Sequence, residues 1–359
     1  MNRSSLQRFR SYGTAGLVAA SLLAGATAAV ADGSERTVLV LTSTNNPASN
    51  AVVVFKLDTS GTPSLSYLDT VATGGRGGAS GNAGILQFED ERGAVANFGS
   101  NTVSELIRED ETISIGGTVS LASGCTQPDS VALTRDHLFI VGANCAESHA
   151  WPFGAAHAAV VRLADPSAAQ IAVGRHWSAV TLKSGSVLQL PLTGEGALSG
   201  ASNPIALPGT ANNTPLGEAF WGDLLGFTPA HSPDSFAIVT RDQGVFPITG
   251  PTPPYPGNAP CWVAKGAGNV WYTGNSPGQA VSIFFSDGGG GVFYKSIPLP
   301  GTPTDLAVSH DGRWLAVIYS ASGDAHVTVF AIDSYGDLTP AATSGSVGVA
   351  AFNGVAISD

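Results

Sequence analysis

Three ionisable residues in the middle of the chain have side chains that can perform acid–base chemistry: His149, Arg175 and Glu218. An imidazole or a carboxylate can act as a general base that activates water. A guanidinium can donate hydrogen bonds to the negative oxygen that develops when a nucleophile attacks a carbonyl carbon. Together these residues would suit attack on a carbonyl group, provided that the fold brings them to one place.

Each of these residues also has a purely structural interpretation, which the sequence leaves open. A histidine in a loop is usually solvated, and an adjacent pair such as Arg175 and His176 often caps the edge of a sheet. A glutamate on a strand can simply pair with a neighbour. Ion-pair networks without catalytic function contain such groups too, so the elements that position them matter.

The elements that must position these residues are short β-strands. Residues 301–320, GTPTDLAVSHDGRWLAVIYS, hold two apolar runs joined by the polar turn 310–313. A single hairpin has too little core to be stable alone. Similar stretches begin at Gln127 and Ala259. In all three, a proline is followed three residues later by an apolar residue and then by alanine.

The hairpin recurs with a period of 43 to 44 residues. Pro260 and Pro303 are 43 residues apart, and Pro128 and Pro260 are 132 residues apart, which is three steps of 44. Single steps from these place further units near Ala83, Ala172, Pro215 and Val347. Strands with alternating apolar residues, such as HVTVFAID, follow the hairpins. Repeats of this length are typical of propeller blades. We predict an all-β fold, a seven-bladed β-propeller with four-stranded antiparallel blades.

The two ends of the repeat array are incomplete in a complementary way. The first unit, from Thr37, lacks an inner strand, and the last segment, GVAIS, lacks outer strands. Pairing of residues 354–358 with residues 37–42 would close the ring and remove two open sheet edges. We therefore expect the C-terminal strand to complete the first blade.

The N-terminal segment has the order of a secretory signal peptide. Three arginines in the first ten residues precede an apolar stretch, residues 15–30, and the small-residue pattern Ala29-Val30-Ala31. Such a segment is removed during export. We expect cleavage after residue 31, a propeller domain over residues 32–359, and a periplasmic or secreted location. An uncleaved anchor is the alternative. No later segment has enough apolar residues to span a membrane.

Composition and motifs exclude several partners and cofactors. The formal net charge of −11 would repel nucleic acid. The glycine run 288–291 lacks the lysine and hydroxyl residue of a phosphate-binding loop. Neither the histidines nor the cysteines have metal-site spacing. The six tryptophans fall at different positions of the repeat, which argues against a quinone-dependent dehydrogenase. We expect a monomer without a cofactor that binds a small molecule.

The three cysteines predict one disulfide. If Arg135-Asp136 forms the hairpin turn, Cys125 faces position 146, one residue from Cys145. Such neighbours lie near the Cα separation that a disulfide accepts. In an oxidising compartment we expect Cys125 and Cys145 to be bonded and Cys261 to stay reduced as a small buried residue. Two free buried thiols are the alternative.

Two segments carry a resemblance to a known family. PTDLAVSHDGRWLAVIYS followed by HVTVFAIDSYGDLTPAAT, and TSTNNPASNAVVVFKLDTSGTPSLSYLDTVATGG near the N-terminus, resemble blades of the seven-bladed lactonase-type propellers. These include 6-phosphogluconolactonases and fungal carboxymuconate-lactonising enzymes. The resemblance spans the mature chain and implies action on a lactone at one mouth of the central channel. Residues 145–230 depart most from the family pattern, and no catalytic motif is matched there.

Strand direction predicts which mouth would hold the site. The loop before each inner strand and the loop after each second strand share one face, called the loop face below. Loops concentrate function, and this face would hold residues 77–82, 124–127, 209–214 and the long segment CAESHAWPFGAAHA, with His149, Trp151 and His157. A lactone site there would use Glu218 or His149 as base and Arg175 as oxyanion donor.

Two functions remain open. The first is an exported lactonase-like enzyme that hydrolyses or forms a lactone or similar cyclic ester. The second is a non-catalytic propeller that binds a small ligand, a glycan or a protein on its loop face. The first rests on the family resemblance and on the polar loops around one mouth of the channel, and the second on the missing catalytic motif, because one fold hosts many functions.

Overall fold

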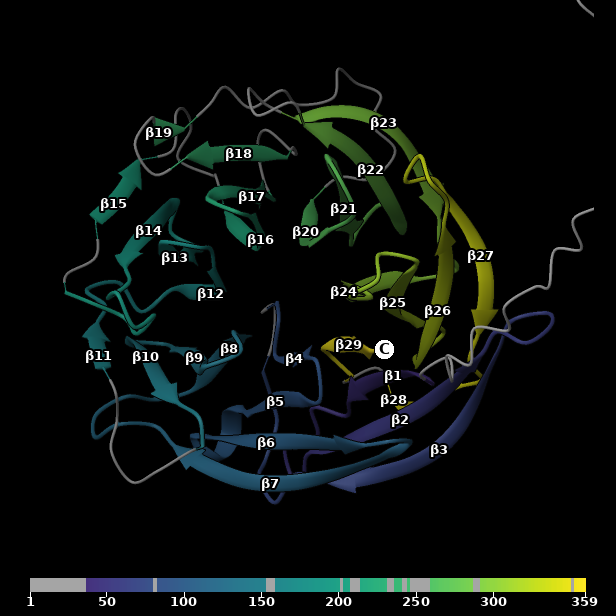
Figure 1. Cartoon of the computed structure of the whole chain (residues 1–359), viewed down its shortest axis with the longest axis horizontal. Coiled ribbons are helices and arrows are strands. Elements are labelled where there is room, and N and C mark those ends of the chain that lie inside the picture. Colours follow the sequence, from purple (N-terminus) through teal and green to yellow (C-terminus); the bar gives the residue numbers. More distant parts are fainter. Residues whose placement is uncertain are drawn as a thin grey trace, which may run out of the picture. The chain divides into compact units, whose positions relative to one another are not determined.

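Seven antiparallel sheets stand around a central axis (Figure 1). This computed structural model describes residues 37–79, 83–152, 159–200, 203–206, 214–230, 236–240, 244–245, 259–286, 291–349 and 352–359. Each sheet has four strands, and the seventh sheet has one further short strand. The strands follow chain order from the axis outward, except that the last strand of the chain is the innermost strand of the first sheet. The predicted all-β, seven-bladed β-propeller with four-stranded antiparallel blades is confirmed.

The first four blades contain the first fifteen strands of the chain and its last strand. The first blade contains β29 (Val355–Ser358), β1 (Val38–Ser43), β2 (Ala51–Asp58) and β3 (Ser64–Ala72). The second contains β4 (Leu86–Glu89), β5 (Arg92–Asn97), β6 (Thr102–Glu109) and β7 (Thr112–Ser120). The third contains β8 (Pro128–Leu133), β9 (His137–Gly142), β10 (Cys145–Ala150) and β11 (Ala159–Arg162). The fourth contains β12 (Ala168–Val173), β13 (Trp177–Leu182), β14 (Ser186–Pro191) and β15 (Asn203–Ala206).

The last three blades follow the same order. The fifth contains β16 (Pro215–Trp221), β17 (Leu224–Pro229), β18 (Ala237–Thr240) and β19 (Gly244–Val245). The sixth contains β20 (Pro260–Lys265), β21 (Val270–Asn275), β22 (Ala280–Ser286) and β23 (Gly291–Pro298). The seventh contains β24 (Thr302–Val308), β25 (Trp314–Ala321), β26 (Asp324–Ile332) and β27 (Leu338–Thr343), and β28 (Gly348–Val349) pairs with β26.

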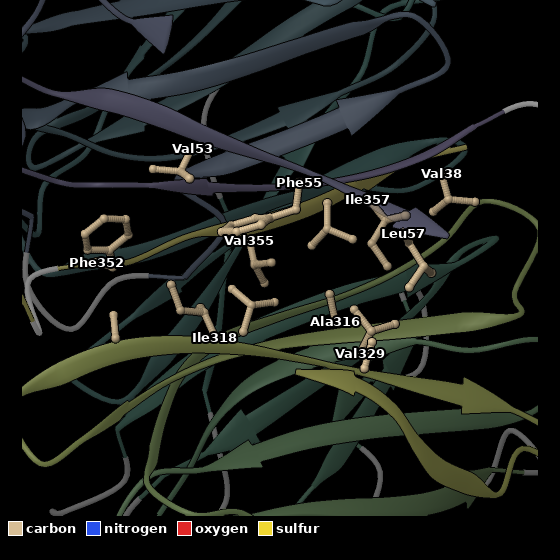
Figure 2. Close-up of a cluster of buried hydrophobic side chains, with 14 residues drawn as sticks. Val38, Val53, Phe55, Leu57, Ala316, Ile318, Val329, Phe352, Val355 and Ile357 are labelled. Atoms are coloured by element: carbon tan, nitrogen blue, oxygen red, sulfur yellow. The ribbon is translucent and has the colours of Figure 1, made fainter. Parts of the chain in front are cut away.

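Blades are packed on both faces, which explains why their middle strands are apolar on both sides. In β2, Val53 and Phe55 pack toward the seventh blade, where Ile318 and Val329 meet them (Figure 2). The alternate residues Val52 and Val54 belong to a second core shared with the second blade. Val, Ile and Phe suit such pleated, buried strands. Each blade is therefore held by its two neighbours.

The last strand of the ring completes the first blade, as predicted. Strand β29 pairs antiparallel with β1, with Leu39 opposite Ser358 and Thr42 opposite Val355. Val355 and Ile357 contribute to the core between the first and seventh blades (Figure 2). The pairing covers the sheet edge that each of the two strands would otherwise leave open.

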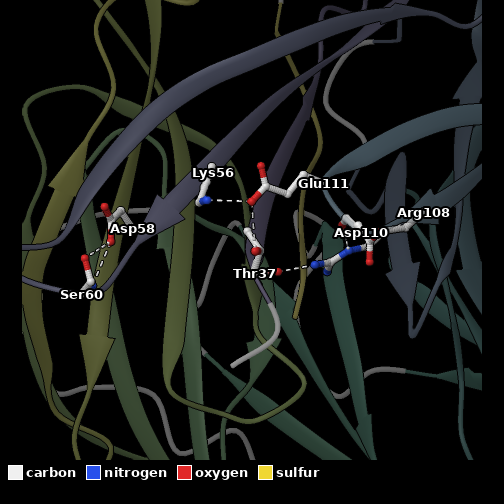
Figure 3. A network of polar contacts seen from close by, with 7 residues as sticks. All are labelled: Thr37, Lys56, Asp58, Ser60, Arg108, Asp110 and Glu111. Atoms are coloured by element: carbon white, nitrogen blue, oxygen red, sulfur yellow. Dashed lines mark hydrogen bonds and ion pairs between the residues drawn. The ribbon is translucent and has the colours of Figure 1, made fainter. Parts of the chain in front are cut away.

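A buried arginine ties the two ends of the ring together. Arg108 of β6 is 3% exposed. Its guanidinium donates to the Thr37 and Asp110 carbonyl oxygens, the latter at 2.8 Å, and to Ser358 Oγ at 2.8 Å. Figure 3 shows the contacts with Thr37 and Asp110, beside the exposed ion pair of Lys56 and Glu111. One side chain of the second blade therefore holds both partner strands of the closure.

Cys125 and Cys145 form the predicted disulfide, with Cα atoms 5.8 Å apart. The hairpin of β8 and β9 has the predicted register between residues 130 and 141, but it shifts by one residue between Pro128 and Ser130, so that Pro128 lies opposite Gly142. Continued beyond the shift, this register sets position 125 against 145. The prediction had set Cys125 against position 146. The register shift removes this offset of one residue and so favours the bond.

Two local predictions about the chain near the cysteines are wrong. Cys261 takes part in no disulfide, as expected, but it is half-buried rather than buried. Residues 145–150 were expected in a long loop and instead form strand β10, paired with both β9 and β11.

No helix among the described residues has the length and apolar character needed to cross a membrane.

Replacement of Arg108 by methionine should weaken the ring closure. The variant leaves the Thr37 carbonyl and Ser358 hydroxyl without their charged donor in a buried place. We expect the free energy of unfolding to fall by about 2–4 kcal/mol, measured from urea-induced unfolding. The matched control, Lys56→Met, removes an exposed ion pair of the same network and should change stability much less. Equal effects of both substitutions would contradict a special role for Arg108.

Thiol counting on the unfolded protein should find one reactive group before reduction and three after it. The disulfide consumes two of the three cysteines, and unfolding exposes the third. In a Cys261→Ser variant the count before reduction should be zero. Three reactive groups in the unreduced wild type would exclude the bond between Cys125 and Cys145.

Candidate functional site

Polar side chains link the inner strands near the axis, at the level where these strands begin. Gln170 of β12 reaches the backbone of the next blade, where its Oε1 accepts the Glu218 amide at 2.8 Å and its Nε2 donates to the Glu218 carbonyl at 3.0 Å. Ser130 Oγ of β8 donates to the Gly84 carbonyl at 3.2 Å and accepts the Ile171 amide at 3.3 Å. These contacts form an axial belt of linked inner strands.

Asp305 extends the axial belt in the seventh blade. It is buried, and its Oδ1 accepts the Leu306 amide at 2.9 Å. Burial raises the pKa of Asp305 to about 7, and the backbone amides of Leu306, Gly84 and Val355 oppose part of that rise. Gly84 suits this crowded place, because a Cβ there would lie 3.1 Å from both Gln170 Nε2 and Ser130 Oγ.

A central cavity of about 580 Å³ lies beyond the axial belt, at the opposite ends of the inner strands. All seven inner strands (β4, β8, β12, β16, β20, β24 and β29) line it with their later residues, among them Phe88, Leu133, Val173, Phe220 and Ile357. The cavity therefore opens toward the turns between the first and second strands of each blade. We call this side the turn face. It is opposite to the predicted loop face.

Acidic and basic groups meet at the mouth of the central cavity. Glu89 and His310 come from the second and seventh blades. Burial raises the pKa of Glu89, the carboxylate of Asp90 adds to the rise, and His310 opposes it. Asp359 accepts hydrogen bonds from the backbone amides of His310 and Asp311, both at 3.0 Å. A carboxyl of raised pKa next to an imidazole is a suitable pair for proton transfer.

Lys265 supplies the cationic group of the cavity wall. Its Nζ donates to the carbonyl oxygens of Gly266 and Gly268 at 2.5 and 2.7 Å. It also lies 5.0 and 5.2 Å from the ring centres of Trp221 and Trp271. Burial lowers the pKa of Lys265 to about 8. The amine is therefore held in place and is easier to deprotonate than an exposed lysine.

Glu218 contributes a buried carboxyl beside the cavity. The residue lines the cavity, and it is only 1% exposed. Among the described residues, neither carboxyl oxygen has a hydrogen-bond partner of normal geometry. Burial raises the pKa of Glu218 well above its usual value, and the nearby amides of Thr181 and Ala172 oppose only part of this rise. Burial thus favours the protonated form of this carboxyl, which can donate a proton.

The other two candidate residues lie elsewhere. Arg175 is exposed in the turn between β12 and β13, on the turn face, and its backbone amide donates to the Gly222 carbonyl at 3.1 Å. His149 was expected in a loop but lies in β10, 4% exposed, with Nε2 3.0 Å from Oε2 of the buried Glu147. His149, Arg175 and Glu218 thus belong to the third, fourth and fifth blades. His157 lies outside the described residues.

Two further hollows also open on the turn face. One, of about 390 Å³, lies between the second and third blades, where Arg92 stacks 5.0 Å from the ring centre of Trp151. The other, of about 870 Å³, lies between the sixth and seventh blades. The central cavity and these two hollows are therefore on the face opposite to the one that loop length suggested.

Sequence reasoning missed Glu89, Lys265 and His310. All three lie at or just beyond the ends of inner strands, where the apolar runs LQF, WVA and LAVS stop. The repeat alignment contains this signal, because the residues that end each inner strand must converge on one mouth of the channel. The predicted site used the starts of the inner strands instead.

Comparison with known proteins gives similarity of fold. No protein-family model matches the chain, and no curated protein matches it. A solved structure from Desulfotomaculum acetoxidans, of unknown function, has a TM-score of 0.68 at 15% identity and covers 89% of this chain and 98% of its own. A candidate 6-phosphogluconolactonase from Bacteroides fragilis has a TM-score of 0.62 at 11% identity, covering 90% and 99%.

An enzyme of another name shares the fold as well. Virginiamycin B lyase from Staphylococcus aureus has a TM-score of 0.54 at 14% identity and covers 78% of this chain and 94% of its own. At such low identities the similarity shows the seven-bladed fold alone, because propellers carry many functions. The chemistry must be argued from the central cavity.

Asp305→Asn should change how stability depends on pH. The pKa of Asp305 is about 7 in the folded protein and about 3.9 in an unfolded chain. Between about pH 3.9 and pH 7, the Asp305 carboxyl therefore keeps its proton in the folded state but has lost it in the unfolded state. The contribution of Asp305 to stability therefore falls as pH rises through this window. From pH 5 to pH 8, the variant should gain on the order of 2 kcal/mol relative to wild type.

Urea-induced unfolding at several pH values measures this gain. The matched control is Asp324→Asn, which changes an exposed aspartate of the same blade. Its difference from wild type should stay constant across the range. A constant difference for Asp305→Asn as well would mean that the Asp305 carboxyl is already ionised at low pH.

Proposed function

We propose that this protein is an enzyme that opens a neutral lactone, or a similar small cyclic ester, in its central cavity. The observation that carries the proposal is the buried carboxyl of Glu218 beside that cavity, which has no hydrogen-bond partner of normal geometry among the described residues. The volume of about 580 Å³ is in the range of small-molecule sites. Similarity of fold to a candidate 6-phosphogluconolactonase and to virginiamycin B lyase supports an enzyme of this kind.

The charges at the cavity favour a neutral substrate. Three carboxyl-bearing residues at the mouth, Glu89, Asp90 and Asp359, outnumber the one lysine, Lys265. A phosphate group would meet like charges there, and the net charge of −11 adds to the repulsion. An unphosphorylated lactone would enter without that cost.

Glu218 would act as the acid of the reaction. Its protonated carboxyl donates a proton to the ring oxygen as the bond between that oxygen and the carbonyl carbon breaks. At the mouth, Glu89 or His310 takes a proton from the attacking water, whose oxygen bonds to the carbonyl carbon. That proton returns to Glu218 after product release. Arg175 does not line this cavity, so Lys265, which does, would stabilise the oxyanion.

The alternative is a propeller that binds the same small molecule without converting it. The distribution of His149, Arg175 and Glu218 over three blades favours this alternative, because a catalytic set usually lies within hydrogen-bond reach of one reacting group. Both functions use the central cavity. Turnover distinguishes them.

We also propose that the protein works outside the cytoplasm. The disulfide between Cys125 and Cys145 supports this location, because such bonds persist in oxidising compartments. The signal-like segment before residue 32 supports it as well.

Purified protein should open a neutral lactone such as glucono-δ-lactone faster than it opens 6-phosphoglucono-δ-lactone. Glu218→Gln keeps the shape of the side chain but removes its acidic proton, so kcat should fall by about 10²- to 10⁴-fold. The rates can be followed by proton release in a weakly buffered assay. Absence of turnover on every neutral lactone of a panel would favour the binding alternative.

The matched control is Glu105→Gln. Glu105 is also a buried glutamate whose pKa burial raises, but it lies on β6, and it does not line the central cavity. Its substitution should leave kcat close to the wild-type value. Equal rates for Glu218→Gln and Glu105→Gln would remove Glu218 from the mechanism.

A further inference from the structure

A groove lies on the turn face between the sixth and seventh blades. Its volume is about 870 Å³. One wall comes from the β20–β21 turn and β23, and the other from the β24–β25 and β26–β27 turns. The groove is separate from the central cavity, with which it shares no lining residue. We call it the tyrosine groove.

Two exposed aromatic rings stand on the two walls of the tyrosine groove. Tyr294 of the sixth blade is 53% exposed, and Tyr335 of the seventh is 80% exposed. Phe285 supports Tyr294 from behind, with ring centres 5.4 Å apart in an edge-to-face arrangement. Large aromatic rings left in water at a concave site usually serve binding, since their burial by a ligand is favourable.

Hydrogen bonds fix the turn that carries Tyr335. Asp333 Oδ1 accepts the backbone amides of Tyr335 and Asp337, each at 2.8 Å. Tyr272, from the sixth blade, donates its hydroxyl to the Gly336 carbonyl at 2.9 Å. The ring of Tyr335 is therefore presented on an ordered turn, which lowers the entropy lost when a ligand binds.

The charged residues of the tyrosine groove are largely paired. Lys295 Nζ donates to Asp337 Oδ2 at 2.7 Å, which bridges the two blades. Arg313 is paired with Asp311 in the neighbouring turn. The ion pairs cancel most of the charge, so the groove offers little attraction to an ion. Its remaining polar edges, Asn269 and Ser334, can exchange hydrogen bonds with hydroxyl groups.

We propose that the tyrosine groove binds a neutral oligosaccharide, whose pyranose rings stack on Tyr294 and Tyr335. A pyranose presents C–H groups on its flat faces and hydroxyls around its edge, which matches aromatic walls with polar groups between them. The volume of about 870 Å³ suits two or three sugar residues. This binding goes beyond the proposed chemistry and does not depend on it.

Calorimetric titration with cellotriose, maltotriose, laminaritriose and mannotriose tests the proposal. At least one of these neutral trisaccharides should bind. Tyr335→Ala and Tyr294→Ala should each weaken that binding at least tenfold, whereas Tyr335→Phe should bind nearly as well as wild type, because it keeps the stacking ring. Failure of all four trisaccharides to bind would overturn the proposal.

Tyr67→Ala is the matched control. Tyr67 is 60% exposed on β3 of the first blade, away from the groove. Its substitution should leave the affinity unchanged, and an equal loss there would mean that the sugar binds to exposed tyrosines in general. Trigalacturonic acid serves as the anionic comparison. Tighter binding of this acid than of every neutral trisaccharide would overturn the neutral character of the site.

Discussion

The pairing of β29 with β1 is the interaction on which the rest of the structure depends. Every blade is buried on both faces by its neighbours, so an opened ring would expose the apolar surfaces of the first and seventh blades at once. Arg108 adds charged hydrogen bonds to both chain segments, from a third position in the sequence. Closure thereby brings all seven inner strands to one axis, where the central cavity forms.

Polar contacts join the inner strands at one level along the axis, and a cavity opens between them at the next level. Gln170, Ser130 and Asp305 link the beginnings of the inner strands. The later residues of the same strands surround the central cavity, and Glu218 lies beside it. A buried carboxyl raises the free energy of the folded protein unless it is protonated. Retaining one next to a cavity is easier to explain by function than by stability.

The fold was predictable because the repeat is regular, whereas the site depends on side chains that no period reveals. Prolines spaced by 43 to 44 residues and the incomplete ends were sufficient to predict seven blades and their closure. The predicted disulfide pair was correct although the register was off by one, since the bulge near Asp129 cannot be read from spacing. The central cavity opens on the face opposite to the one that loop length suggested, since residues 145–150 form a strand and not a loop. The contacts of Gln170 with the next blade arise from tertiary structure, which spacing does not reveal.

The order of strands in the first blade has a consequence for the timing of folding. β1 is the first strand of the ring in the chain and β29 the last, so their pairing joins residues more than 300 positions apart. Contacts of such long sequence separation form slowly, because the entropy of closing the loop must be lost first. While the chain is synthesised, the ring stays unfinished until residues 355–358 emerge. Until then the facing apolar surfaces of the first and seventh blades and one edge of β1 stay uncovered.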